Sequence, residues 1–357
     1  MVTPSLFHPI TAVGVMSGTS LDGLDVCLCN FGIQHSTWQY TILAAETFPY
    51  DVEMKEQLSS AHRLDALQLL TFHAEYGKYI GKTVKQFIDR HGVIPLLIAS
   101  HGHTVFHQPA QGVTFQTGSG AAIAAETDIN TVCDFRTTDV AHGGQGAPLV
   151  PIGDQLLFPD YDYCLNLGGF ANISYEQEGR RIAYDICPVN YVLNHYIRAV
   201  GLDYDAEGVM AAGGSVHEDL LDALNSLDFY TQQGPKSMGR EWVEREIFPA
   251  MEQYSIPLAD KLRTYCEHAA VQIGRTIGNG RVLVTGGGTF NKFLLNRIAA
   301  HTKGFLHVPE TLLIHYKEAL IFALLGTLYF TNQVNCLASV TGAQADSIGG
   351  ALYKVNN

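Results

Sequence analysis

The sequence has few basic side chains, and they are not clustered. It contains 22 Lys and Arg against 35 Asp and Glu, and its formal net charge at pH 7 is −13. No run of Lys or Arg is longer than two residues. Because nucleic-acid-binding proteins need a concentrated basic surface to neutralise phosphates, we expect no nucleic-acid partner.

Long apolar segments and a secretory leader are also lacking. The longest apolar run, 319–330, is well short of the roughly 20 residues that a membrane-spanning helix needs, and it indicates a buried helix instead. The first residues show no basic leader followed by an apolar core. The seven cysteines include no Cys-x-x-Cys pair, which is typical of reduced, buried thiols. We therefore expect a soluble cytoplasmic protein with no membrane partner.

Two common catalytic motifs are absent as well. The sequence has no Gly-x-Ser-x-Gly elbow, so nothing supports a serine hydrolase. It also has no Gly-Lys-Ser/Thr segment, and this excludes a Walker-type phosphate loop.

The length and composition indicate a folded protein of more than one domain. A single hydrophobic core usually stops growing near about 250–300 residues. The chain has 357 residues and so predicts two domains, or one domain with a deep cleft. Hydrophobic residues make up 46% of it and charged residues 16%, which excludes wholesale disorder.

The two halves of the chain begin with the same pattern. An apolar run at 12–16, a Gly/Ser/Thr turn and further strand-like runs open the first half, up to residue 48. An amphipathic helical periodicity over 64–90, with Leu67 and Leu70 on its apolar face, and a buried parallel strand at 95–100 follow. Strand, glycine turn and two further strands recur between residues 163 and 187. Two copies of one α/β unit would give this order, so we predict an α/β fold.

Three glycine-rich turns stand at strand junctions, at 14–25, 166–174 and 285–291. Glycine lets backbone N–H groups converge on phosphate oxygens, and the hydroxyls of Ser17, Thr19 and Ser20 in the first turn add donors. The third turn precedes a helix, whose N-terminus favours an anion. Each turn alone has an ordinary explanation as a β-turn. Three of them together indicate a nucleotide bound between two related lobes.

Acidic side chains near these turns are candidates for chemistry. Asp22 and Asp25 would hold magnesium, directly or through water. Asp185 ends a strand, before Pro188 and Asn190, where a carboxylate is well placed to act as a general base. The alternative is that Asp185 caps the helix expected near residue 190.

Two polar loops are candidates for substrate binding. The 134–151 loop carries Arg136 and Asp139, which would clamp a polar substrate unless they form a surface ion pair. His101 and His103 lie in the other loop, which directly follows the expected strand at 95–100. Zinc sites usually include a cysteine or a carboxylate, and neither lies in that loop, so hydrogen bonding to substrate hydroxyls is the better interpretation.

Seven segments, in one order along nearly the whole chain, together resemble a known family. They are GVMSGTSLDGLDV (14–26), SHGHTVFHQP (100–109), FRTTDVAHGGQGAPLVP (135–151), NLGGFANIS (166–174), GPKSMGREW (234–242), TGGGTFN (285–291) and KEALIFALL (317–325). This set is similar to the anhydro-N-acetylmuramic acid kinase family, and the first and third segments are highly specific.

The resemblance implies a fold and a division of the chain. The family belongs to the superfamily of acetate and sugar kinases, heat-shock chaperones and actin. Its members have two RNase-H-like, actin-like ATPase lobes with a central nucleotide cleft. Lobe I would comprise residues 1–133 and about 338–357, and lobe II residues 134–337. A homodimer is also implied by the resemblance.

The implied activity is an ATP-dependent kinase reaction on 1,6-anhydro-N-acetylmuramic acid. Water attacks the anomeric carbon and opens the anhydro bond, and the freed 6-oxygen takes the γ-phosphoryl group of ATP. The products are ADP and N-acetylmuramic acid 6-phosphate, which enters peptidoglycan recycling. The implied partners are the sugar and ATP, with Mg²⁺ as a cofactor.

Individual roles are implied by position. Asp185 would be the base that deprotonates the water. The sugar pocket would be lined by His101, Thr104, Arg136 and Pro148, and Glu318 would close it.

The ATP contacts would fall on the three glycine turns. Asn172 would lie near the γ-phosphate, Asp22 would be the better magnesium candidate, and the third turn would flank the adenosine. The turn residues so assigned are Gly18, Thr19, Ser20, Leu21, Asp22, Gly23, Leu24, Asp25, Gly168, Gly169, Gly286, Gly287 and Gly288.

One segment departs from the family pattern. The family reads Asp-Thr-Gly-Pro-Gly-Asn around its base, and this chain reads Asp185-Ile186-Cys187-Pro188-Val189-Asn190. Glycine permits a positive φ and a close substrate approach that β-branched Val189 does not. Contacts to the lactyl or acetamido group are therefore expected to differ, which leaves the exact sugar open. Met238 also stands where the family commonly has Thr.

Two alternative functions remain open at this point. One is a kinase of the same fold that acts on another anhydrosugar or a hexosamine. The other is a non-catalytic, actin-like nucleotide switch. Asp185 argues against the switch, because a switch needs no base in a sugar pocket.

Overall fold

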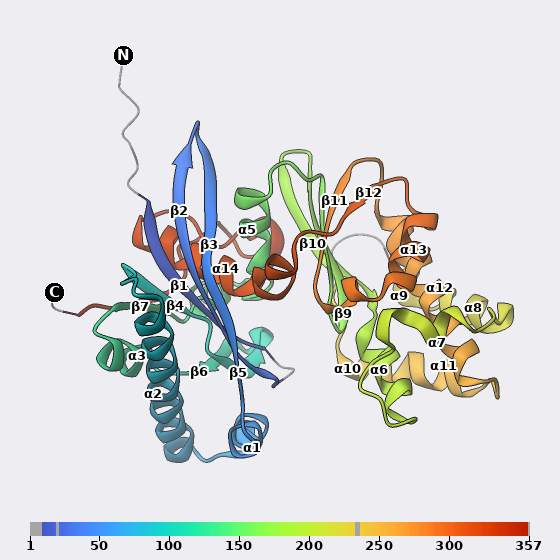
Figure 1. Cartoon of the computed structure of the whole chain (residues 1–357), viewed down its shortest axis with the longest axis horizontal. Coiled ribbons are helices and arrows are strands. Elements are labelled where there is room, and N and C mark those ends of the chain that lie inside the picture. Colours follow the sequence, from blue (N-terminus) through green and yellow to red (C-terminus); the bar gives the residue numbers. More distant parts are fainter. Residues whose placement is uncertain (1–8, 19–20, 233–235, 356–357) are drawn as a thin grey trace. The chain divides into compact units, whose positions relative to one another are not determined.

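The computed structural model describes residues 9–18, 21–232 and 236–355 (Figure 1). Within them the chain forms two compact units. The first unit runs to Phe158 and resumes at Tyr316, and the second unit spans Pro159–His315. This division differs from the expected boundaries, because residues 134–158 and 316–337 lie in the first unit.

A six-stranded mixed sheet forms the centre of the first unit. Its strands, in spatial order, are β13 (Ala351–Tyr353), β7 (Asn130–Cys133), β4 (Leu97–Ser100), β1 (Ile10–Ser17), β2 (Gly23–Gln34) and β3 (Thr37–Pro49). The strands β1, β2 and β3 form an antiparallel meander, as the sequence predicts. β4 runs parallel to β1, and β7 runs parallel to β4. The predicted buried parallel strand at 95–100 is thereby confirmed.

A separate hairpin and several helices complete the first unit. The hairpin consists of β5 (His103–Gln108) and β6 (Val113–Thr117). The helices are α1 (Val52–Ser60), α2 (Ala66–His91), α3 (Gly120–Thr127), α4 (Thr137–Ala141), α5 (Val150–Leu157), α14 (Thr311–Phe330) and α15 (Ala338–Thr341), with short 3₁₀ turns η1 (Ala61–Arg63) and η2 (Pro109–Gln111).

The helix α2 confirms the periodicity predicted over 64–90. Asp65 and Gln68 form a reciprocal capping box at its start, and Gly92 ends it with a φ of 65°. Leu67 and Leu70, which the sequence placed on the buried face, are 75% and 61% exposed. Both lie in the first part of α2, before Phe72, which is the first buried residue of the helix. The buried face consists of Phe72, Tyr76, Ile80, Val84 and Phe87.

The helix α14 lies against the first sheet at points where only glycine fits. A Cβ atom on Gly14 of β1 would overlap the carbonyl oxygen of Ala319. A Cβ atom on Gly326 would come within 2.5 Å of the Cβ of Ala99 in β4. On α5, a Cβ on Gly153 would lie 2.6 Å from the side chain of Ile321. Close packing of this kind fixes α5 and most of α14 to the first sheet, which explains the observed division of the chain.

By length and composition, α14 is also the one helix in the described ranges that could cross a membrane. The apolar 18-residue segment of α14 is 72% buried inside the protein, as in a core helix. The buried helix predicted at 319–330 is therefore confirmed, and it begins earlier, at Thr311.

The second unit repeats the strand order of the first. Its sheet, in spatial order, consists of β10 (Arg180–Pro188), β9 (Phe170–Gln177), β8 (Tyr163–Leu167), β11 (Arg281–Thr285) and β12 (Phe305–His307). β8, β9 and β10 form an antiparallel meander, and β11 and β12 continue the sheet in parallel. The order matches β3-β2-β1-β4-β7, so the predicted duplication of an RNase-H-like α/β unit is confirmed.

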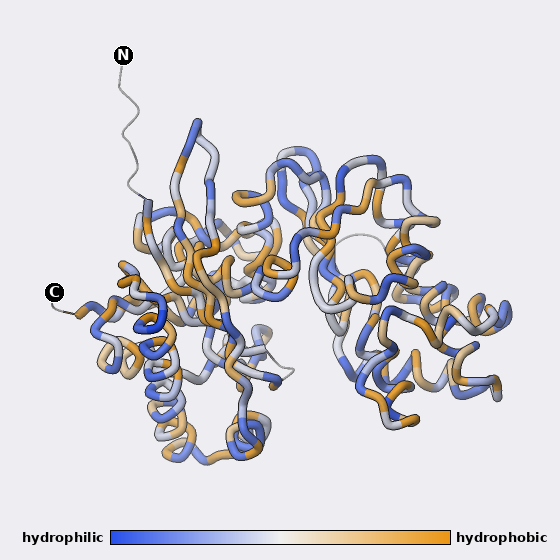
Figure 2. Tube along the Cα trace, viewed as in Figure 1, coloured by the Kyte–Doolittle hydropathy of each residue, from blue (hydrophilic) through white to orange (hydrophobic). Residues whose placement is uncertain are grey.

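The second unit also contains a set of mostly short helices. They are α6 (Asn190–Arg198), α7 (Val209–Ala212), α8 (Glu218–Asn225), α9 (Asp228–Thr231), α10 (Arg240–Trp242), the π-helical η4 (Val243–Ile247), α11 (Phe248–Glu252), α12 (Leu258–Thr276) and α13 (Lys292–His301), with 3₁₀ turns η3 (Ala206–Gly208) and η5 (Gly287–Phe290). Hydrophobic residues run along the inner strands of both sheets, whereas the tip of the β2–β3 hairpin is hydrophilic (Figure 2).

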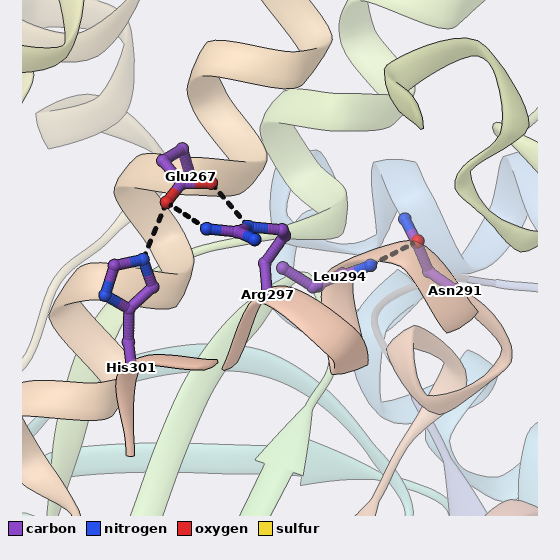
Figure 3. Close-up of polar contacts among 5 residues, drawn as sticks. All are labelled: Glu267, Asn291, Leu294, Arg297 and His301. Atoms are coloured by element: carbon purple, nitrogen blue, oxygen red, sulfur yellow. Dashed lines mark hydrogen bonds and ion pairs between the residues drawn. The ribbon is translucent and has the colours of Figure 1, made fainter. Parts of the chain in front are cut away.

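A buried carboxylate joins α12 to α13 in the second unit (Figure 3). Both oxygens of Glu267 accept hydrogen bonds from Arg297, at 2.7 Å each, and Oε1 also lies 2.6 Å from Nε2 of His301. Desolvation raises the pKa of Glu267, but the hydrogen bonds from Arg297 and His301 outweigh it, and the net pKa is lowered. This group therefore favours folding when it is ionised.

We predict that Glu267→Gln lowers the free energy of unfolding at pH 7 by about 1–3 kcal/mol, because a buried charged acceptor is lost. The folded-state pKa of Glu267 is lowered, so its contribution is present above the unfolded pKa and disappears as the pH falls through the folded pKa. Denaturant unfolding across the acid range should show the two proteins converging at low pH. Glu176→Gln, an exposed change on β9, serves as the control. A difference that persists unchanged at low pH would contradict the assignment.

Candidate functional site

The first glycine turn connects β1 to β2 and closes tightly. The N–H of Leu21 donates to the carbonyl of Gly18 at 3.3 Å, and Leu21 has a φ of 59°, which is uncommon for a non-glycine residue. A Cβ on Gly23 would lie 2.6 Å from the carbonyl oxygen of Phe48, so glycine is required there. Thr19 and Ser20, predicted to bind phosphate, lie outside the described residues.

Side chains of this turn face different environments. Asp22 is exposed, whereas Leu24 is fully buried in the core of the first unit, where it pairs with Ser17 of β1 and Phe48 of β3. Asp25 is half-buried, and its Oδ1 accepts a hydrogen bond from Thr47 at 2.6 Å. Among the residues that the structure describes, no cluster of three or more His, Cys, Asp or Glu forms a complete protein-only metal site.

Several buried side chains next to this turn are linked by hydrogen bonds. Ser17 is 2% exposed; its Oγ lies 3.1 Å from Nδ1 of His103 and accepts a hydrogen bond from Tyr50 at 2.8 Å. The hydroxyls of Tyr50 and Tyr76 are 2.7 Å apart. The sequence predicted Ser17 as a phosphate donor, but its hydroxyl is engaged inside the protein. The roles of Tyr50 and Tyr76 were not predicted, because their partners lie far away in the sequence.

Arg136 and His101 form the centre of a second constellation in the first unit. Nε and Nη2 of Arg136 lie 3.1 and 3.0 Å from Nε2 of His101, and Nη1 donates to the carbonyl of Gly146 at 3.2 Å. Because guanidinium can only donate, Nε2 of His101 carries no proton. Nδ1 therefore carries the proton and donates to the carbonyl of Gly102 at 2.9 Å.

The environment of His101 keeps its imidazole neutral. The ring is 4% exposed and packs against Phe322, with 4.7 Å between ring centroids. Burial lowers the pKa of His101 well below its usual value, and the charge of Arg136 adds to the shift. Both ring nitrogens are engaged within the protein, so His101 orients Arg136 and has no donor left for a sugar hydroxyl. This arrangement gives no support to the zinc alternative.

The other residues predicted for the sugar pocket also belong to the first unit. Thr104 is half-buried in β5, and Pro148 is exposed after a cis peptide bond with Ala147. Glu318 is accessible on α14, yet the surrounding protein raises its pKa, which the charges of Lys317 and Arg136 oppose.

An ion pair beside Glu318 was not predicted from the sequence. Lys317 pairs with Asp154 of α5 at 2.6 Å, and both side chains are buried. This ion pair holds Lys317 at the start of the part of α14 that belongs to the first unit. Glu318 is the next residue, so its backbone is held in place as well.

Asp139 does not clamp a substrate, and it forms no surface pair with Arg136. It is 1% exposed, and Oδ2 accepts a hydrogen bond from the N–H of Gly146 at 2.7 Å. Oδ1 accepts hydrogen bonds from Thr341 and Cys336. The sequence interpretation of Asp139 was wrong because its partners lie about two hundred residues away along the chain, at 336 and 341.

In the second unit, the second and third glycine turns meet. A Cβ on Gly288 would lie 2.7 Å from Cβ of Leu167, and a Cβ on Gly286 would lie 2.5 Å from Oδ1 of Asn166. Gly286 has a φ of 86°, which also favours glycine. Gly287 is exposed, and a Cβ there would meet nothing within 4 Å. The two turns pack together, while Gly287 stays open to a flat ligand.

Gly168 and Gly169 form the turn between β8 and β9, and their carbonyls bind the start of α6. The carbonyl of Gly169 accepts hydrogen bonds from the N–H groups of Val189 and Tyr191, and that of Gly168 accepts one from Asn190. The hairpin is therefore tied to the first turn of α6.

A row of polar residues crosses the end of the second sheet. In the strand register, Asp185 of β10 pairs with Asn172 of β9, Asn172 pairs with Asn166 of β8, and Asn166 pairs with Thr285 of β11. Directly paired residues share one face of a sheet, so these side chains lie side by side. The hydroxyl of Thr285 is buried without a hydrogen-bond partner among the described residues. Asn172 and Asp185, each predicted as a site residue, are thus neighbours on paired strands, and the sequence interpretation missed Asn166 and Thr285.

The carboxylate of Asp185 is held by a distant segment. Its own N–H donates to the carbonyl of Lys236 at 2.9 Å, and its Oδ2 accepts a hydrogen bond from the N–H of Met238 at 3.1 Å. Oδ1 accepts no hydrogen bond from the described residues and remains available. Burial raises the pKa of Asp185, and the hydrogen bond from Met238 partly opposes the shift. Val189 occupies the N-cap position of α6, so Asp185 does not cap that helix.

The departure from the family pattern lies in the core. Ile186, Cys187 and Val189 are between 0% and 3% exposed and belong to the hydrophobic cluster of the second unit. Val189 has a φ of −130°, so it does not adopt the left-handed conformation that favours glycine. The altered side chains fill the interior behind Asp185, so the structure gives no reason to expect changed sugar contacts from them.

Comparisons with known proteins show which family this chain resembles. Residues 10–355 match the family model described as anhydro-N-acetylmuramic acid kinase. A protein of that name from Gloeobacter violaceus is 35% identical, over 94% of this chain and 96% of its own. Its counterpart from Vibrio parahaemolyticus is 34% identical, over 96% of this chain and 98% of its own.

Similarity to solved structures is weaker. The (R)-2-hydroxyglutaryl-CoA dehydratase component A of Acidaminococcus fermentans gives a TM-score of 0.44 at 10% identity, over 88% of this chain and 96% of that chain. A likeness at this level carries no argument, so the fold assignment depends on the strand order of the two sheets. The family assignment depends on the model match and the sequence relatives, and by both the chain belongs to the anhydro-N-acetylmuramic acid kinase family.

Proposed function

We propose that this protein is an ATP-dependent kinase that hydrolyses and phosphorylates 1,6-anhydro-N-acetylmuramic acid in peptidoglycan recycling. The observation that carries the proposal is family membership over nearly the whole chain, and the half-buried carboxylate of Asp185, held by the N–H of Met238, supports it. Water adds to the anomeric carbon and loses a proton to Asp185, while the bond from that carbon to the 6-oxygen breaks. The 6-oxygen then bonds to the γ-phosphorus, and the bond from that phosphorus to the ADP oxygen breaks.

Two features support Asp185 as the base. The hydrogen bond from Met238 fixes one carboxylate oxygen and leaves the other available to a water molecule. Burial raises the pKa of Asp185, which makes the ionised carboxylate a stronger acceptor of protons near neutral pH. A nucleotide switch would need neither feature.

Arg136 is proposed to bind the sugar through its remaining donors. Three of its N–H groups are directed to His101 and Gly146, and the other two have no partner among the described residues. A guanidinium with two spare donors suits a carboxylate, and the lactyl group of a muramic acid supplies one. We place Thr104, Pro148 and Glu318 in the same sugar site, with His101 acting through Arg136.

The phosphate and adenosine contacts are proposed from the three glycine turns. Backbone N–H groups of Gly18 to Asp25 would hold phosphate oxygens, as would Gly168, Gly169 and Asn172 of the second hairpin. Gly287, whose surface is open, would meet the adenosine between Gly286 and Gly288. Phosphoryl transfer asks a protein mainly for such positioning and charge compensation.

Magnesium is proposed as the cofactor. In kinases this ion is held mostly by phosphate oxygens and water, with one or two protein carboxylates. Asp22 fits that requirement because its carboxylate is exposed at the first turn, and the half-buried Asp25 lies nearby in the sequence. The ion would supply positive charge to the phosphates.

We further infer that the reaction takes place in the cytoplasm, where ATP is available. The seven cysteines are all free thiols, as expected there. The homodimer implied by the family resemblance stays a prediction.

The proposed substrate is tested directly with ATP, Mg²⁺ and a panel of sugars. We expect ADP release and a phosphorylated sugar with anhydro-N-acetylmuramic acid, and little with anhydro-N-acetylglucosamine, which lacks the lactyl carboxylate. Mass spectrometry identifies the product. ADP release with another sugar but none with anhydro-N-acetylmuramic acid would contradict the proposal.

Removal of the base should abolish turnover. We predict that Asp185→Asn lowers kcat by about 10²–10⁴-fold, the usual contribution of a general base, while ATP binding is largely kept. Steady-state kinetics and calorimetric titration with an ATP analogue measure the two effects. Asp203→Asn, an exposed change in the same unit, should leave both unchanged. Near-normal rates in Asp185→Asn would show that another group is the base.

The pH dependence should reveal the raised pKa of Asp185. The base must be ionised, so kcat/KM should fall as the pH drops through this pKa, above the usual range for aspartate. Glu318 also has a raised pKa, and the residual activity of Glu318→Gln should keep the same acid limb. The account fails if the folded wild-type protein shows no acid limb above the pH where an ordinary aspartate titrates.

A further inference from the structure

The carboxylate of Asp139 holds the loop that carries the sugar-site arginine. Asp139 lies on α4, and its side chain is 1% exposed. Oδ2 accepts a hydrogen bond from the N–H of Gly146 at 2.7 Å, and Oδ1 accepts one from Oγ1 of Thr341 at 2.7 Å. The Sγ of Cys336 donates a third, at 3.2 Å.

These donors compensate a buried charge without a cation. Among the described residues, no Lys, Arg or His forms an ion pair with Asp139. An isolated buried carboxylate is costly unless several hydrogen bonds satisfy it, so each of these donors carries a large share of the compensation. The carboxylate therefore constrains both the 142–148 loop and the 336–341 segment.

The loop fits around the carboxylate only with glycine. A Cβ on Gly144 would overlap Oδ2 of Asp139. Gly146 has a φ of 64°, and a Cβ there would lie 2.7 Å from Val140. The loop is further tied to the C-terminal segment, since the N–H of Gln145 donates to the carbonyl of Thr341 at 2.9 Å.

Gly146 connects Asp139 to the proposed sugar site. Its N–H is held by Asp139, and its carbonyl accepts the hydrogen bond from Nη1 of Arg136. Arg136 is held on its other side by His101. The position of the guanidinium is therefore set by two contacts, one of which depends on the Asp139 carboxylate.

We propose that Asp139 is a positioning residue for sugar binding, which fixes Arg136 through the backbone of Gly146. This inference rests on the proposed function of Arg136. Asp139 itself does not touch the sugar, because its carboxylate is buried and fully engaged with the 142–148 loop and the 336–341 segment.

The test compares Asp139→Asn with Thr341→Val and Thr341→Ser. The amide of Asp139→Asn has one acceptor oxygen in place of two. If its NH₂ group faces Gly146, the hydrogen bond from the N–H of Gly146 is lost, and in the flipped orientation the bond from Thr341 is lost. We expect KM for the anhydrosugar to rise about tenfold, while KM for ATP changes less than about twofold. Thr341→Val should raise the sugar KM in the same direction, and Thr341→Ser, which keeps the hydroxyl, should restore it. Steady-state kinetics with thermal unfolding of each variant provide the readouts.

A purely structural role predicts a different result. Partial unfolding would lower the concentration of active enzyme and thus the apparent kcat, and would leave both KM values unchanged. Unchanged sugar KM in an active Thr341→Val protein would overturn the positioning role, even if Asp139→Asn failed to fold. A wild-type protein that is inactive on the anhydrosugar would overturn the proposed function instead, so the two failures are distinguishable.

A double-mutant cycle connects the effect to the guanidinium. Arg136→Lys loses the fork that reaches both Gly146 and His101. If Asp139 acts through Arg136, the double variant should have a sugar KM less than about twofold higher than that of Arg136→Lys alone. Multiplicative effects of the two changes would contradict the proposed route.

Discussion

The backbone of residues 236–238 holds the side chain on which the proposed chemistry depends. Asp185 ends β10, and the segment that donates to its carboxylate lies 53 residues further along the chain. The contact fixes one oxygen and leaves the other available, while the surrounding protein raises the pKa of the group. The altered residues beside Asp185 pack into the core of the second unit behind it. Their side chains can therefore change while Asp185 keeps its position.

In the proposed sugar site of the first unit, the important side chain is likewise held in place by hydrogen bonds within the protein. Arg136 is oriented by a neutral imidazole on one side and by a peptide carbonyl on the other. Neither of these hydrogen-bond partners brings a negative charge, although the charge of Glu318 also acts on the guanidinium. Asp139 adds a carboxylate to this arrangement without neutralising Arg136, because that carboxylate is satisfied by Gly146, Thr341 and Cys336.

Features set by local sequence could be predicted, and features set by distant contacts could not. The strand meanders, the turn glycines and α2 follow from short-range periodicity and from capping and turn residues such as Asp65 and Gly92. The buried face of α2 was partly mistaken, since hydrophobic Leu67 and Leu70 face solvent. The polar row through Asn166 depends on strand register, and the chain Ser17–Tyr50–Tyr76 depends on tertiary packing. Neither leaves a pattern along the sequence.

The most direct test of the central claim follows the oxygen of water. The reaction is run in ¹⁸O-labelled water with ATP, Mg²⁺ and anhydro-N-acetylmuramic acid, and the products are analysed by mass spectrometry. Attack of Asp185-activated water on the anomeric carbon predicts one heavy oxygen in the sugar and none in the transferred phosphate. Label in the phosphate, or release of labelled inorganic phosphate in place of a sugar phosphate, would show that water attacks phosphorus and would contradict the account.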